Sequence, residues 1–131
     1  MDEGHLLTTM TIKPFEPKYM KVGVLTRNDR VVEICEVVKG PVSAECVSRD
    51  VPGLLEEGRS IAKWHEHVVV KVPFCKEGLE ATHALTTDGI PVNMTLVFSP
   101  NQALLAASAG ATYVSCFMGR LDDISIDSGG V

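Results

Sequence analysis

The sequence has no long apolar run and no excess of basic residues. No stretch approaches the ~20 apolar residues that cross a bilayer, so we predict no membrane-spanning helix. Twelve basic residues stand against 17 acidic ones, for a net charge of -5, and their scattered positions argue against a nucleic-acid-binding surface. The first residues, MDEGH, are acidic and lack the apolar core of a signal peptide. We therefore expect a cytoplasmic protein that binds neither nucleic acid nor membrane.

Paired cysteine motifs are also missing. The four cysteines lie far apart and none forms a C-x-x-C pair, namely Cys35, Cys46, Cys75 and Cys116. Zinc-ribbon and thioredoxin-like chemistry therefore have no support. Each cysteine lies in or beside an apolar segment, so we expect free, reduced thiols.

One pair of histidines has a spacing that could suit a metal site. His65 and His67 flank Glu66 and could share a metal ion if they lay on a strand. No third ligand follows nearby, and a structural metal site needs about four ligands. We interpret the pair as a junction between a helix and a strand, and we predict neither a metal nor a cofactor.

The chain does contain a regular alternation of helical and extended patterns. Its 131 residues, 45% hydrophobic and 22% charged, suit one globular domain. The patterns predict helices from Asn28 or Asp29 to residue 39, over 52–65, over 77–87, and to residue 108 from an N-cap at Ser99 with Pro100 following. Strands are predicted over 41–47, 68–72, 91–98 and 112–118, with a further candidate over 19–25. Such alternation is typical of a parallel α/β fold.

A lysine stands inside one of these strands. Lys71 interrupts a run of valines, VVVKV, that Pro73 closes, and a run of this kind reads as a strand buried on both faces. A buried ammonium loses its hydration, and the usual outcome is loss of the proton. The resulting amine is a nucleophile suited to imine formation with a carbonyl. The alternative is that Lys71 lies at the strand end and reaches water.

Polar residues recur on the other strands at matching places. Glu45, Lys71, Thr95 and Ser115 follow one another at separations of 26, 24 and 20 residues. The strand period of two places further residues on the same face of each strand, among them Ser43, Val47, Val69, Asn93, Val97, Tyr113 and Phe117. In a β/α barrel, this is the inward face near the catalytic mouth.

Four segments carry a resemblance to a known family. They are GPVSAECVS (40–48), VVVKVP (68–73), EGLEATHALTTDGIPVNMTLVFSPNQALLAASAGATYVS (77–115) and GRLDD (119–123). They resemble the transaldolase family, in particular its short subfamily that includes fructose-6-phosphate aldolase. The resemblance implies an eight-stranded β/α barrel and a class I mechanism without a cofactor. It also implies sugar phosphate substrates and a step of the pentose phosphate pathway.

The resemblance assigns roles to the lysine and to three residues around it. Lys71 matches the Schiff-base nucleophile, and Glu45 matches the acid/base group that works with a catalytic water. Thr95 would hold that water, and Asn93 would contact the sugar hydroxyls.

Three more residues match substrate-binding positions. Ser115 would line the same pocket, Phe117 would lie nearby, and Arg120 resembles a residue that holds the substrate phosphate. Glu45 and Phe117 favour transaldolase, because the aldolase branch is expected to carry glutamine and tyrosine there.

The sequence also departs from the family pattern. No LDTA-like strand with a catalytic aspartate is found, and Met10 stands where a TTNP motif would place asparagine. The resemblance ends at residue 123, and the remaining residues, 124–131, are too few for the last two β/α units expected. We therefore predict a partial barrel of about five parallel strands over 28–123, with a divergent segment over 1–27 and a tail over 124–131.

This partial pattern leaves several functions open. One reading is a transaldolase whose activity is impaired, and a second is a fructose-6-phosphate aldolase that releases its product to water. A third reading is an inactive scaffold that keeps the lysine in an inherited core. Because an open sheet exposes its edges, we expect self-association as a homo-oligomer.

Overall fold

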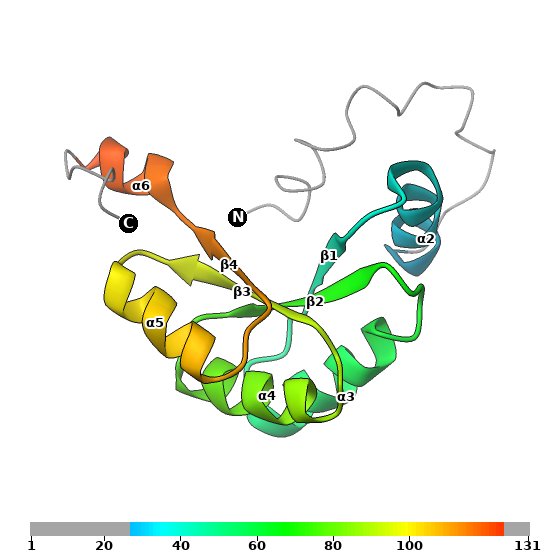
Figure 1. Ribbon diagram of the computed structural model, residues 1–131, viewed down its shortest axis with the longest axis horizontal. Helices are drawn as coiled ribbons and strands as arrows, with labels where there is room; N and C mark the ends of the chain where they lie inside the picture. Colours follow the sequence, from blue (N-terminus) through cyan, green and yellow to red (C-terminus); the bar gives the residue numbers. More distant parts are fainter. Residues whose placement is uncertain (1–26, 125–131) are drawn as a thin grey trace.

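The computed structural model describes residues 27–124, and it places them in a parallel β-sheet with a helix after each strand (Figure 1). In chain order the elements are α2 (Arg27–Val38), β1 (Val42–Glu45), α3 (Val51–Ile61), β2 (Val68–Pro73), α4 (Lys76–Thr87), β3 (Val92–Val97), α5 (Pro100–Ser108), β4 (Tyr113–Cys116) and α6 (Met118–Asp123). The strands lie in the order β1-β2-β3-β4, and all neighbours are parallel. This arrangement confirms the predicted α/β class and is that of a partial β/α barrel. The fifth candidate strand, 19–25, lies outside the described residues.

Helices α3, α4 and α5 lie on one side of the sheet (Figure 1). Alternate residues of the first three strands turn toward this side, namely Val42, Ala44, Val70, Val72 and Val92. They form a buried core with residues of α3 and α4, among them Leu54, Ile61, Ala81 and Leu85. Parallel strands joined through helices bury both faces, which explains the valine-rich strands. None of the helices within residues 27–124 is long and apolar enough to span a bilayer.

Two helix starts follow from capping residues. The Ser99 hydroxyl accepts a hydrogen bond from the Gln102 N–H at 3.2 Å, and Pro100 opens α5 as predicted. Asp50 caps α3 by accepting from the Gly53 N–H at 2.7 Å. These caps set where each helix leaves the carboxyl end of the preceding strand.

The predicted cap of the first helix is wrong. Asn28 and Asp29 both lie inside α2, which includes Arg27. Asp29 falls in the first turn, where a carboxylate is favourable beside the positive end of the helix dipole. An acidic residue in that turn therefore gave the same local signal as a cap.

The second predicted helix is shorter than expected. It ends at Ile61 instead of residue 65. Beyond it, the Lys63 and Trp64 N–H groups bond to carbonyls three residues back, those of Ser60 and Ile61. Such bonds tighten the chain into a turn that leads to β2.

The last strand also ends early. β4 stops at Cys116, and Met118 begins the short helix α6, where a strand to residue 118 was predicted. The other strand ends differ from prediction by one or two residues, which is within the usual variation of such boundaries.

A bulge in β3 changes which side one residue faces. Asn93 and Thr95 were predicted to share a face with Val97. Leu96 has a positive φ of 60°, and the register with β4 shifts between Met94 and Val97. Val97 consequently packs with Met94 in the core on the helix side, so its predicted placement is wrong.

Candidate active site

Lys71 lies in the middle of β2 and is only 4% exposed. The register places it between Glu45 on β1 and Asn93 on β3. Its Nζ is 3.2 Å from Oε2 of Glu45, whose side chain keeps 24% of its surface exposed. A buried ammonium needs such a partner, so the lysine is held inside the sheet rather than at a strand end.

Asn93 links three strands through its amide. Its Nδ2 donates to Oγ of Ser43 on β1 at 3.0 Å, and its Oδ1 accepts from Oγ of Ser115 on β4 at 3.0 Å. Asn93 is 5% exposed, so both ends of a buried amide are satisfied. Because β2 lies between β1 and β3, this chain of hydrogen bonds runs beside Lys71 on the same face.

Thr95 follows Asn93 on the same face of β3, and its register partner on β2 is Pro73. It is fully buried, and within residues 27–124 its Oγ1 has no hydrogen-bond partner. A buried hydroxyl without a protein partner is a group that a bound water can satisfy. This geometry suits the water-holding role that the resemblance implies.

Phe117 and Arg120 form a second group beyond the end of β4. The Arg120 guanidinium lies 5.2 Å from the centre of the Phe117 ring. The Phe117 ring meets that of Phe98 edge-on, with centroids 5.5 Å apart. Arg120 itself is exposed to solvent.

Sequence reasoning proposed no role for two residues of these groups. Ser43 was placed on the correct face by the strand period, and its hydrogen bond to Asn93 completes the polar row. Phe98 could not be found by that period, because the bulge at Leu96 reverses it. The repeat spacing also aligned Thr95 with Lys71, whereas Asn93 is the register partner of Lys71.

The paired histidines lie at the junction between α3 and β2, as interpreted from the sequence. His65 Nε2 is 3.3 Å from Oε1 of Glu36, and His65 Nδ1 accepts from the His67 N–H at 3.1 Å. Across residues 27–124 no three histidine, cysteine or acidic side chains gather as a metal site would require.

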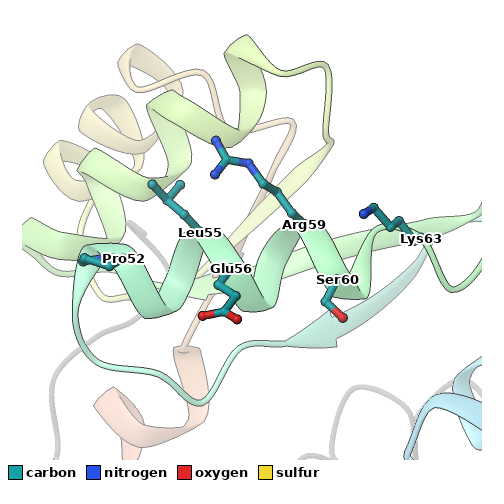
Figure 2. A pocket seen from close by; sticks show the side chains of 6 residues that line it. All are labelled: Pro52, Leu55, Glu56, Arg59, Ser60 and Lys63. Carbon is teal, nitrogen blue, oxygen red and sulfur yellow. The ribbon is translucent and has the colours of Figure 1, made fainter.

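A groove on α3 contains none of these groups. A groove of about 620 Å³ runs along the outer side of this helix, and all its lining side chains come from α3 or the turn after it (Figure 2). Its Arg59 pairs with Asp88 at 2.8 Å. The buried row around Lys71 is the better candidate site, because it gathers a lysine, a carboxylate and an amide on one face of the sheet.

The cysteines differ in their expected reactivity. Burial, reinforced by the nearby Glu57 carboxylate, raises the pKa of the Cys46 thiol to about 12. Burial also raises the pKa of the Cys35 thiol. Cys116, by contrast, is exposed. Only the thiolate reacts, so these environments separate inert from available thiols.

We predict that iodoacetamide at pH 8.5 modifies Cys116 in the folded protein and leaves Cys46 intact. Mass spectrometry of peptides before and after denaturation measures this, and all four cysteines should react once the chain is unfolded. Because the folded state keeps the Cys46 proton, its contribution to stability is present below pH 9 and is lost as the pH rises toward about 12. Equal modification of Cys46 and Cys116 in the folded protein would contradict the prediction.

Comparison with known proteins decides the family. A sequence model of the transaldolase/fructose-6-phosphate aldolase family matches residues 22–129. The chain belongs to this family. Its relatives include a probable transaldolase from Myxococcus xanthus, 62% identical over 99 residues, which are 76% of this chain and 44% of the relative. A probable transaldolase from Aquifex aeolicus is 63% identical over 95 residues, which are 72% of this chain and 44% of the relative.

A third probable transaldolase, from Kosmotoga olearia, is 59% identical over 99 residues, or 76% of this chain and 45% of the relative. The chain thus spans less than half the length of these curated relatives. The family match includes the four strands of residues 27–124 and both groups of candidate site residues. Membership of the transaldolase/fructose-6-phosphate aldolase family therefore rests on the segment that carries the site.

Proposed function

We propose that this chain is a Schiff-base transaldolase that transfers a dihydroxyacetone unit between sugar phosphates, in a step of the pentose phosphate pathway. The observation that carries the proposal is the lysine inside a buried strand, 3.2 Å from a carboxylate. An amine becomes a good nucleophile when a neighbouring base can take its proton. The Glu45 carboxylate is placed to do this for Lys71.

The first steps of the reaction follow from that pair. The Lys71 amine attacks the ketone carbon of fructose 6-phosphate, and the carbinolamine loses water to give the imine. A base removes the proton of the C4 hydroxyl, the C3–C4 bond breaks, and its electron pair passes into the enamine while glyceraldehyde 3-phosphate leaves. Glu45 serves as the acid/base group, acting through a water that Thr95 holds. The enamine then attacks a second aldehyde, and hydrolysis of the new imine frees the lysine.

The remaining residues bind the substrate. The Asn93 amide contacts sugar hydroxyls from its place between Ser43 and Ser115, and Ser115 lines the pocket. Phe117 and Arg120 lie beyond the end of β4, where the guanidinium holds the substrate phosphate. The reacting carbon is thus bound at the middle of the sheet and the phosphate near the end of β4.

We expect the 131-residue chain on its own to turn over more slowly than about 1 s⁻¹, the low end of ordinary enzymatic rates. Lys71 supplies the covalent step, but proton transfer typically contributes a further ~10²–10⁴-fold to the rate. That machinery is incomplete here, because no LDTA-like strand with a catalytic aspartate is found and Met10 stands where asparagine is expected. A coupled assay with fructose 6-phosphate and erythrose 4-phosphate measures the rate. Product release without erythrose 4-phosphate would instead show the aldolase reaction. A rate well above 1 s⁻¹ would contradict the expected impairment.

We also propose that the protein self-associates. None of the four residues of β4 is buried, although β2 and β3 are almost wholly buried, and Leu104 and Leu105 on α5 are 67% and 53% exposed. Apolar surface beside an edge strand favours association. Sedimentation at micromolar concentration should show a dimer or a larger species. A monomer that unfolds in one sharp transition would refute the proposal.

Two further assignments complete the proposal. The four free cysteines support a reducing compartment, in keeping with a cytoplasmic enzyme. We propose that the functional unit is residues 28–123, with 1–27 and 124–131 as flanking segments. The family match over 22–129 supports a unit of about this extent.

A further inference from the structure

The bulge in β3 places an aromatic side chain on the substrate side of the sheet. Along a regular strand, Asn93 and Thr95 would be followed on the same face by Val97, and Phe98 would turn toward the helices. Leu96 instead adopts a φ of 60°, and the register with β4 shifts by one residue there. A residue other than glycine is strained at positive φ, so the surrounding structure must hold this conformation.

The reversal has two visible consequences. Val97 is fully buried in the helix-side cluster with Met94 and Ala106. Phe98 therefore turns to the other face, where its ring meets that of Phe117 edge-on, with centroids 5.5 Å apart. The Phe98 N–H donates to Oε1 of Gln102 at 2.6 Å, which ties this turn of the chain to α5.

Phe117 in turn contacts Arg120. The guanidinium lies 5.2 Å from the Phe117 ring centre, within the range of a cation–π contact. Arg120 is exposed and lies on the short helix α6, beyond the carboxyl end of β4 (Figure 1). The ring of Phe117 is thus a fixed surface for a side chain that would otherwise sample many rotamers.

We propose that Phe98 is a positioning residue, which the Leu96 bulge turns toward the site so that its ring fixes Phe117 and, through it, the Arg120 guanidinium for phosphate binding. This inference rests on the proposed phosphate-binding role of Arg120. Phe98 does not touch the substrate. Its effect is confined to the phosphate end of the ligand, because Lys71 and Glu45 are held by β1 and β2.

The geometry is tested by NMR on three variants with ¹⁵N-labelled arginine. Phe98→Leu should move the Arg120 Nε–Hε resonance toward its position in an unfolded peptide, because the Phe117 ring no longer holds one orientation. Phe98→Tyr should restore it. The matched control is Phe74→Leu, since Phe74 packs on the helix side against the Met94 cluster and should leave Arg120 unchanged.

The functional consequence is tested with two ligands in borohydride trapping at Lys71. Phe98→Leu should raise the concentration of fructose 6-phosphate needed for half-maximal adduct by about 2- to 10-fold, the factor expected for loss of one aromatic pair. It should leave adduct formation with dihydroxyacetone, which has no phosphate, unchanged.

An unmoved Arg120 resonance, or equal weakening of both ligands, would overturn the inference. If the wild-type chain forms no adduct with either ligand, the proposed function fails, while the Arg120 resonance still decides the role of Phe98.

Discussion

Substitution of Lys71 with arginine is expected to abolish covalent trapping of a ketose phosphate. Sodium borohydride reduces the imine to a stable amine, so the wild-type protein should gain the mass of the reduced sugar at Lys71. A guanidinium remains protonated and cannot attack a carbonyl. The Lys71→Arg variant should therefore show no adduct, which is a complete loss of signal.

The control for this experiment is Lys76→Arg. Lys76 is exposed at the start of α4 and has no place in the buried row, so this variant should be trapped as well as the wild type. Peptide mass spectrometry locates the modified residue. An adduct on another lysine, or none on the folded wild-type chain, would refute the proposed nucleophile and favour the inactive scaffold.

Replacement of Gly78 by alanine is expected to lower the free energy of unfolding by about 3 kcal/mol or more, at the upper end of overpacking effects. Gly78 lies in the first turn of α4, and a Cβ there would collide with the carbonyl oxygen of Pro73 and press on Val72. Backbone cannot move aside as a flexible side chain can. The close approach seats α4 on the end of β2, two residues beyond Lys71.

Gly119→Ala is the matched control for Gly78→Ala. A Cβ at Gly119 meets no atom within 4 Å, and alanine favours the helix by up to ~1 kcal/mol over glycine. Urea unfolding of both variants measures the difference. If Gly78→Ala is as stable as the wild type, Gly78 of α4 does not lie against the Pro73 carbonyl at the end of β2.

The local features of the fold could be read from the sequence. The run VVVKV predicted β2, and Ser99 with Pro100 predicted the start of α5, because a buried strand and a helix cap depend on residues close together in the chain. The period of two likewise placed Ser43, Glu45, Asn93 and Ser115 on the face of Lys71. Where a local signal had two meanings, as with Asp29 at the start of α2, the prediction failed.

By itself, then, the sequence determined the order and type of the elements from α2 to β4, the family, and the side of the sheet on which the polar residues lie. The tertiary structure decided which of them meet. Asn93 lies level with Lys71 where spacing favoured Thr95, and the Leu96 bulge exchanges Val97 for Phe98. Both depend on the pairing of strands that are distant in the sequence, as with Lys71 and Asn93 or Val97 and Cys116. A pattern within one strand does not contain the register of its neighbours.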